Sequence, residues 1–448
     1  MAGAQQLPCA SPLPNASTAK GLVLFGTCGW SDDSILRCGR FYPAWVKSAE
    51  QRLEFYGTHF PCVEVDSSTY AIPRPSVTAN WAARVPAGFA FHFKAFGLFC
   101  HRQCSFSSLP AEVKQALQQR EAGSGLGGGG GGGVTLSLEQ LGPELEAAVW
   151  GAFHACLEPV MKAGRMGCVV FQFQLSFKPC PDSRAHVEHC RRRLDPRVPM
   201  AVEFRNRAWF AGPAAAADTA RWLASLAPLG GAALVAADEL RHETYVSRGG
   251  YGAAAAAAPP MPEVLPIALE VSDPRFTYVR LHRREGSRER LLRQEEAQAW
   301  AQRLASLVPQ LSGPAYFLIG TDWEDAPVVN AGLLAAALPP HMRLDWRAAL
   351  AAAAAGRRGT IHSLFAGVGK RAAQAPPAAA VRAPAAAEGA SAAPLEGACG
   401  RSGPDEEVEE EADCKVRLGT AAVPEAPLET DSSNGAGGEG QRGGVLWT

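Results

Sequence analysis

Residues 200–210 read MAVEFRNRAWF, and this stretch decides how the rest of the sequence is interpreted. It begins with apolar residues, as a buried β-strand does, and then carries Glu203 and Arg205 two positions apart. Successive side chains of a strand point to opposite faces, so these two share a face. Because buried charges cost free energy unless they are paired, this ending indicates either a closing ion pair or a functional site.

Seven more apolar runs of strand length occur along the chain: Leu22–Gly26, Cys62–Asp66, Phe89–Lys94, Cys168–Phe173, Ala232–Ala237, Phe276–His282 and Ala315–Gly320. Segments with apolar residues at helical spacing lie between most of them: Ala49–Thr58, Pro75–Arg84, Glu144–Ala163, Asp182–Leu194, Pro213–Leu226, Leu291–Leu311 and Pro327–Ala337. Only the connection between the sixth and seventh strands lacks a convincing helix. Eight strands alternating with helices predict an α/β protein, and their number favours a closed TIM-like (β/α)8 barrel.

Low-complexity segments set the predicted domain limits. Seven consecutive glycines occupy residues 127–133, and an alanine tract occupies residues 253–258. Such composition buries too little apolar surface to offset its ordering entropy. We expect one barrel domain over residues 21–350, with flexible insertions at about 120–137 and 249–263. Residues 1–20 are expected to be unstructured, and residues 351–448 form a disordered Ala/Pro/Gly-rich and acidic tail.

The formal net charge of -1 conceals an asymmetry, because residues 371–448 carry -7 and residues 1–370 carry +6. The mildly positive charge of residues 1–370 favours an anionic ligand. It is far smaller than that of a dedicated nucleic-acid-binding protein. No apolar run has the length of a membrane span, and the first twenty residues lack the pattern of a secretory signal. With 12 scattered cysteines, the sequence predicts a reduced, cytoplasmic protein without membrane association, and leaves organellar targeting open. The sequence gives no indication of oligomeric state.

Polar residues lie at the C-terminal end of nearly every predicted strand. The carboxyl ends of parallel barrel strands meet at one face, which is where TIM barrels carry their active sites. We therefore expect one site built from Glu64, Asp66, His92, Lys94, Gln172, Gln174, Glu203, Arg205, Asp238, Arg280, His282 and Asp322.

Several motifs, taken in order, resemble one family. They include GTCGW at 26–30, VEVDSSTYAIP at 63–73, FAFHFKAF at 89–96, AVEFRNRAW at 201–209 and YVRLH at 278–282. Together they resemble the YecE-like family, the domain of unknown function 72, and HFKAFGLFC at 92–100 resembles its plant and algal branch. The resemblance spans about residues 21–340 and implies a TIM-type barrel. Family members commonly carry Asn where this chain has Asp66, Asn-Asn near Asp322 and Gly at Arg283, so the resemblance leaves the substrate open.

The first functional hypothesis is an enzyme acting on a small anionic ligand, sugar-phosphate-like or nucleotide-like, at the C-terminal face of the barrel. Lys94, Arg205 and Arg280 would hold the anion, since arginine offers two parallel donors to it. Glu203 or Glu64 would be the general base and His282 the general acid. The remaining assignments are catalytic for Asp238 and ligand-binding for Tyr70, Gln172, Trp209 and Asp322.

Two alternatives remain. A nucleic-acid or anion-binding module without catalysis would use the basic run Arg280, Arg283, Arg284, Arg288, Arg290 and Arg293, with stacking by Trp30, Tyr70, Trp209 and Trp323. A metal-dependent phosphodiester hydrolase would use Glu64, Glu203, Asp238, His282 and Asp322, although no HxH or HExxH spacing supports it. No cofactor is identified by the sequence. Cys28, near the first strand end, is either a reactive thiol or an inert buried cysteine.

Overall fold

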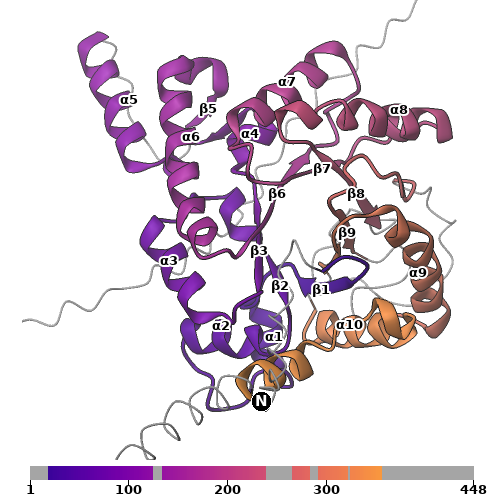
Figure 1. The fold of residues 1–448 in the computed structure, drawn as a ribbon. Coiled ribbons are helices and arrows are strands. Elements are labelled where there is room, and N and C mark those ends of the chain that lie inside the picture. The colour runs from indigo at the N-terminus through magenta and orange to yellow at the C-terminus, as the bar shows by residue number, and fades with distance from the viewer. Residues whose placement is uncertain (1–18, 125–133, 239–264, 283–290, 321–322, 356–448) are drawn as a thin grey trace, which may run out of the picture. The chain divides into compact units, whose positions relative to one another are not determined.

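The centre of the molecule is a closed barrel of eight parallel strands (Figure 1). The computed structural model describes residues 19–124, 134–238, 265–282, 291–320 and 323–355. The barrel strands are β1 (Val23–Thr27), β2 (Cys62–Val65), β3 (Ala90–Lys94), β6 (Met166–Phe173), β7 (Met200–Phe204), β8 (Ala233–Asp238), β9 (Thr277–Leu281) and β10 (Ala315–Ile319). Around the barrel they follow the order β1-β10-β9-β8-β7-β6-β3-β2. The predicted TIM-like barrel is confirmed, and every predicted strand lies within two residues of an observed one.

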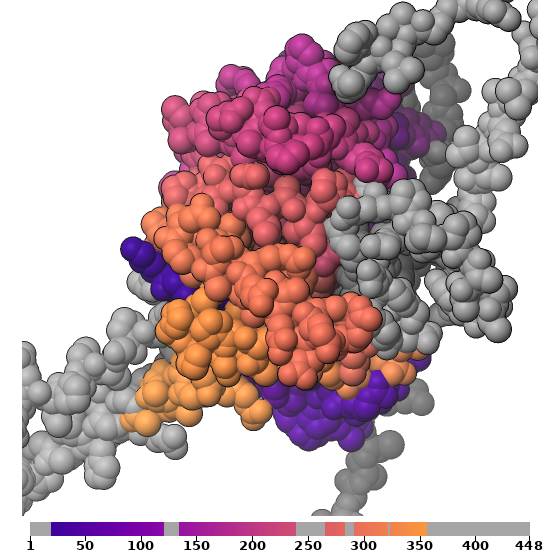
Figure 2. Space-filling model, turned by 90° about the vertical axis from the view of Figure 1, so that its right-hand side faces the viewer, coloured from indigo at the N-terminus to yellow at the C-terminus, as the bar shows by residue number. Residues whose placement is uncertain are grey.

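Helices cover the outside of the barrel (Figure 1). The seven predicted ones are α2 (Ala49–Gly57), α3 (Pro75–Arg84), α6 (Leu138–Lys162), α7 (Pro181–Arg193), α8 (Pro213–Ala224), α9 (Gln294–Leu307) and α10 (Ala326–Ala337). In Figure 2, the orange atoms of α9 and α10 form part of the outer layer on one side. None of the helices in the described ranges has both the length and the apolar character required to cross a bilayer.

The connection between β3 and β6 holds elements that the sequence did not predict. They are α4 (Gly97–His101), a hairpin of β4 (Gln103–Ser105) with β5 (Thr135–Ser137), and α5 (Ala111–Ser124). A short helix, α1 (Asp33–Cys38), also follows β1. The expected insertion at about 120–137 overlaps α5 and β5, while 125–133 and 249–263 lie outside the described residues, as do 1–18 and 356–448.

The strand residues alternate between two apolar clusters. Leu24, Cys62, Ala90, Ala201 and Tyr278 belong to the cluster inside the barrel. The residues between them, such as Phe25, Val63, Phe91 and Val202, belong to the cluster that packs beneath the helices. This alternation sends Glu203 and Arg280, two positions after Ala201 and Tyr278, into the barrel interior near its carboxyl end.

Candidate functional site

Arg280 joins two buried carboxylates across the inside of the barrel. Its Nη2 lies 2.9 Å from Glu64 Oε1, and its Nη1 lies 2.8 Å from Glu203 Oε2. The Arg280 side chain is 3% exposed, and the two glutamates are more deeply buried. The three residues come from β9, β2 and β7, none of which neighbours another in the barrel. The structure therefore brings these three predicted site residues together at one point.

Further donors form hydrogen bonds with the remaining oxygens of the two carboxylates. The hydroxyl of Tyr278 donates to Glu64 Oε2 at 2.9 Å. The amide of Gln172 donates to Glu203 Oε1 at 2.6 Å, and Arg205 Nε donates to the same oxygen at 3.3 Å. All four carboxylate oxygens thus accept a hydrogen bond. Sequence reasoning missed Tyr278, although it lies two positions before Arg280 and so shares its face.

The charges around Glu203 keep it ionised. Burial opposes ionisation, but Arg280 and Arg205 outweigh it and hold the pKa of Glu203 well below its usual range. A carboxylate in this state is a weak proton acceptor at neutral pH. The general-base role expected for Glu203 is therefore not supported, and its contacts are those of a residue that positions two arginines.

A second ion pair lies beside this network. Lys94, at the end of β3, places Nζ 2.9 Å from Oδ1 of Asp66, which begins the 3-10 helix η1 (Asp66–Thr69) after β2. Burial opposes the charge on Lys94, but Asp66 raises the pKa of the ammonium above its usual value. Burial likewise opposes ionisation of Asp66, yet Lys94 lowers the pKa of the carboxyl. Much of the positive charge that Lys94 would offer to an anion is consequently compensated by Asp66.

His282, directly after β9, is held neutral. Its Nδ1 lies 3.2 Å from the carbonyl oxygen of Gly320, so Nδ1 carries the proton and Nε2 carries the lone pair. Nε2 is buried and has no hydrogen-bond partner among the described residues. Burial, aided by the charge of Arg280, lowers the pKa of His282 to about 3. A neutral imidazole cannot act as the general acid expected from the sequence, but its lone pair can accept a hydrogen bond.

Asp238 departs from the predicted arrangement. Ala233 and Val235 of β8 point into the barrel, so Asp238 falls on the opposite, outer face of the strand. Its Oδ2 accepts a hydrogen bond of 3.1 Å from Nε1 of Trp300, on α9. This corrects the expectation that Asp238 is a catalytic group at the barrel mouth.

Trp209 was expected to bind a ligand, but the structure buries its side chain. It lies in the 3-10 helix η3 (Arg207–Phe210), is 1% exposed and stacks on Phe204 with ring centroids 4.1 Å apart. Its Nε1 donates to the carbonyl of Phe177 at 2.7 Å. The indole packs in the wall of the domain and offers no face to a ligand.

The other predicted residues differ in exposure. Tyr70 follows η1 and is 68% exposed, so its ring is open to solvent. His92 is buried inside the barrel, where its Nδ1 accepts from the backbone N–H of Cys168 at 3.2 Å. Asp322 and the basic residues at 283–290 lie outside the described residues.

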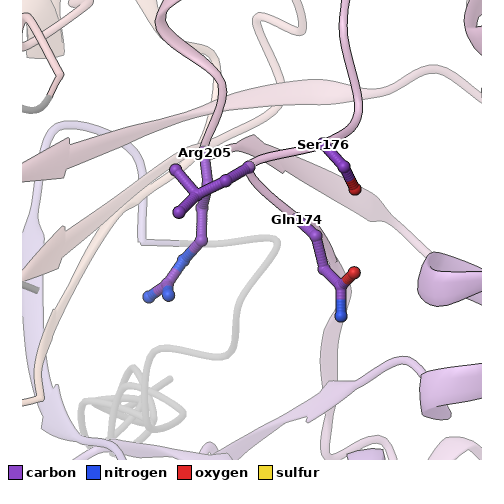
Figure 3. A pocket seen from close by; sticks show the side chains of 4 residues that line it. Gln174, Ser176 and Arg205 are labelled. Atoms are coloured by element: carbon purple, nitrogen blue, oxygen red, sulfur yellow. The ribbon is translucent and has the colours of Figure 1, made fainter. Parts of the chain in front are cut away.

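An open hollow lies next to the buried network. It has a volume of about 380 Å³ and is lined by Gln174, Leu175, Ser176 and Arg205. The first three follow β6 and Arg205 follows β7, so the hollow sits at the carboxyl ends of two adjacent strands (Figure 3). The Arg205 side chain is 29% exposed. It therefore connects the hollow to Glu203 beneath it.

A metal site receives little support from these residues. The described ranges contain no group of three or more His, Cys, Asp or Glu side chains arranged to hold an ion. Glu64 and Glu203 also bind Arg280, which a cation would have to displace. Asp322, a further member of the expected ligand set, lies outside the described residues.

Comparison with known proteins identifies related chains. The family model described as "Protein of unknown function DUF72" matches residues 24–353. The UPF0759 protein YunF of Bacillus subtilis (strain 168) is 27% identical over 194 residues, which is 43% of this chain and 54% of YunF. The UPF0759 protein YecE of Escherichia coli (strain K12) is 36% identical over 61 residues, 14% of this chain and 22% of YecE. The chain thus spans about half or less of the length of these curated relatives.

Solved structures of similar proteins also match. A DUF72 family protein from Enterococcus faecalis V583 gives a TM-score of 0.49 at 16% identity, covering 71% of this chain and 95% of that one. A DUF72 family protein from Thermotoga maritima MSB8 gives a TM-score of 0.47 at 19% identity, covering 70% and 97%.

Proposed function

The chain belongs to the DUF72 family of proteins of unknown function, and from this starting point we propose that its barrel mouth binds a small anionic ligand. The ligand class is sugar-phosphate-like or nucleotide-like. The observation that carries the proposal is the position of Arg205, which lines the hollow and also contacts the buried Glu203. A guanidinium fixed in this way is oriented before an anion arrives, which lowers the entropic cost of binding.

The hollow suits such a ligand in size and polarity. Its volume of about 380 Å³ falls within the range of small-molecule sites. Gln174 and Ser176 supply an amide and a hydroxyl, which can pair with hydroxyl groups of a sugar.

Binding is better supported than catalysis. Both buried carboxylates accept hydrogen bonds from Arg280, and His282 is neutral at pH 7. The lowered pKa of Glu203 makes it a weak proton acceptor, and neutral His282 is not the protonated group that a general acid requires. We therefore assign the site a binding role, and turnover of a bound ligand is a separate question for assay.

A thermal-shift screen tests this proposal. The full-length protein is heated with sugar phosphates, nucleotides, their unphosphorylated counterparts and short oligonucleotides. A ligand at 100 times its dissociation constant stabilises the native state by about 2.7 kcal/mol. We expect phosphorylated small molecules to raise the melting temperature and their unphosphorylated counterparts to have less effect.

The variant Arg205→Ala links any shift to the hollow. We expect it to lose the ligand-induced shift, whereas the exposed Arg207→Ala, with the same loss of charge two residues away, keeps it. Stabilisation by oligonucleotides alone would favour the nucleic-acid-binding alternative. Equal shifts for wild type and Arg205→Ala would show that the ligand binds elsewhere.

A further inference from the structure

A second hollow opens at the barrel mouth, on segments outside the site described above. It has a volume of about 290 Å³, and Trp323, Glu324 and Asp325, which follow β10, form one side of it. Arg40, from the segment between β1 and α2, and Leu291, just before α9, also line it. Around the barrel β10 neighbours β1, and neither strand neighbours β6 or β7. This hollow is therefore separate from the one that follows β6 and β7.

The hollow has an apolar side that is open to solvent. Trp323 is 38% exposed, and Trp323 and Leu291 are two of the seven large apolar side chains that are exposed in the described ranges. Val329, on α10, continues the same side. Exposed apolar surface that is gathered at one hollow, and not scattered singly, is typical of a ligand site. The volume lies just below the range of sites for drug-sized ligands, so it suits one small ring.

The polar side is an ion-pair cluster (Arg40, Glu324 and Asp325) that keeps hydrogen-bonding atoms unused. Nη2 of Arg40 contacts Oε2 of Glu324 and Oδ1 of Asp325, and Nε of Arg40 donates to the same Asp325 oxygen at 2.9 Å. Within the described part of the chain, no hydrogen bond involves Nη1 of Arg40, Oε1 of Glu324 or Oδ2 of Asp325. One donor nitrogen and two acceptor oxygens therefore remain on residues that line the hollow.

The backbone of Glu324 fixes this cluster in place. Its φ of 47° lies in the left-handed region, which costs free energy for a residue other than glycine. The N–H of Glu324 donates to Oγ of Ser34 at 2.8 Å, and Arg40 holds the side chain, so residues that follow β1 maintain this conformation. The carboxylate is thereby positioned before a ligand arrives, which lowers the entropic cost of binding.

We propose that this hollow binds a neutral saccharide, with the apolar face of one pyranose ring on Trp323 and its hydroxyl groups bonded to the unused atoms of the ion-pair cluster. A sugar hydroxyl both donates and accepts, so it suits a donor nitrogen accompanied by acceptor oxygens. An anion would be repelled by the two carboxylates and a cation by the guanidinium, whereas a neutral ligand avoids both repulsions. The ligand carries no phosphate and occupies a different hollow, so this inference goes beyond the binding role proposed above.

The test uses the full-length protein and a panel of neutral saccharides. The panel holds the methyl glycosides of glucose, galactose, mannose and xylose, and linear trisaccharides of each sugar. Saturation-transfer difference NMR detects weak binding, and its titration gives dissociation constants. We expect at least one saccharide to bind with a dissociation constant at or below about 10 mM, the range for a ligand with so few non-hydrogen atoms.

Two tryptophan variants locate the binding. Trp323→Ala should weaken it about ten-fold or more, because the apolar face of the sugar loses its partner. Trp323→Phe, which keeps an aromatic face, should recover most of the affinity. Trp45→Ala is the matched control, because Trp45 is also exposed but packs edge-on against Phe55 and does not line the hollow. Its affinity should stay within a factor of about two of the wild type.

The variant Glu324→Ala tests the polar side. It removes one acceptor and leaves Arg40 paired with Asp325, and we expect about five-fold weaker binding. The proposal is overturned if no member of the panel binds in the stated range. It is also overturned if Trp323→Ala weakens binding no more than Trp45→Ala does, because the saccharide then lies elsewhere on the protein.

Discussion

Nη1 of Arg280 lies 2.8 Å from Oε2 of Glu203, although β8 separates their strands in the barrel. The contact therefore crosses the barrel interior instead of running along the sheet. The contact holds the guanidinium and the carboxylate in fixed positions. Each of the two buried charges is also neutralised by the other. Arg205 is tied to the same carboxylate and reaches the open hollow, so the buried pair also orients the exposed end of the site.

Removing Arg280 alone should destabilise the protein strongly. Arg280→Met leaves Glu64 and Glu203 buried without their cation, and we expect a loss of about 3–5 kcal/mol in the free energy of unfolding. Adding Glu64→Gln and Glu203→Gln to this variant should recover most of the loss, because no buried carboxylate is then left without the cation of Arg280. Urea unfolding measures all three proteins. A loss below about 1 kcal/mol for Arg280→Met would show that water or another cation compensates the carboxylates.

Stability should fall as the pH falls below neutrality. The pKa values of His92 and His282 are each lowered to about 3, chiefly by burial, whereas an unfolded histidine titrates near 6.5. Between these values the unfolded state binds protons that the folded state does not, so acid favours unfolding. Each histidine contributes a slope of up to about 1.4 kcal/mol per pH unit. Glu203, with its lowered pKa, acts in the same direction below about pH 4.5.

Urea unfolding at pH 7, 6 and 5 measures this slope. The variant His92→Asn keeps an acceptor for the backbone N–H of Cys168 but does not titrate, so we expect it to reduce the slope by the share of one histidine. An unchanged slope in His92→Asn would mean that the buried histidine is protonated in the folded state.

Arg205 should matter for ligand binding more than for stability. Its contact with Glu203 is 3.3 Å long and partly exposed, so Arg205→Ala should cost less than about 1 kcal/mol of stability. We expect the same change to weaken binding of a phosphorylated ligand by about ten-fold or more, since it removes a charge-assisted contact. Isothermal titration of wild type, Arg205→Ala and Arg207→Ala measures the affinities. Equal losses in both variants would indicate a diffuse charge effect in place of a specific contact.

Much of this site can be predicted from strand patterns alone. The eight strands are short apolar runs, and charges two residues apart at their ends share a face, as Glu203 and Arg205 do. The same spacing places Tyr278, Arg280 and His282 on one face of β9 and of the residue after it. Which residues share a face depends only on their spacing within one strand, so it can be predicted without knowing the exact shape of the barrel.

Asp238 shows where such reasoning fails. β8 reads ALVAAD and is buried on both faces, so no alternation of polar residues reveals which side chains point inward. The pairing of Lys94 with Asp66 was unpredictable for another reason. It depends on the stagger between neighbouring strands, which the sequence of either strand does not contain.

Trp209 should prove structural. Trp209→Phe removes the hydrogen bond to the carbonyl of Phe177 and part of a fully buried ring, so we expect a loss of about 1–3 kcal/mol in unfolding free energy. Affinity for a phosphorylated ligand should remain within a factor of about two, because the indole does not line the hollow. Urea unfolding and titration separate the two effects. A large loss of affinity at unchanged stability would restore Trp209 to the binding site.

Gly320 should be required for the position of His282. A Cβ atom there would lie 2.4 Å from Cε1 and 2.8 Å from Nδ1 of the imidazole, closer than any normal contact. Gly320→Ala must therefore displace the ring, and overpacking of this kind costs about 1–3 kcal/mol. Gly151→Ala on α6 is the control, because no atom lies within 4 Å of its new Cβ, and alanine should stabilise this helix by about 0.5–1 kcal/mol.

A double-mutant cycle identifies the cause of the cost at Gly320. If the imidazole is the obstacle, His282→Ala should make Gly320→Ala nearly neutral, and the coupling energy should approach the full cost of the glycine substitution. Urea unfolding of the wild type, the two single variants and the double variant provides the four free energies. Additive costs would mean that the destabilisation caused by Gly320→Ala comes from the backbone at this position and not from a clash with the His282 ring. In that case the orientation of the Nε2 lone pair would depend on the hydrogen bond to the Gly320 carbonyl alone.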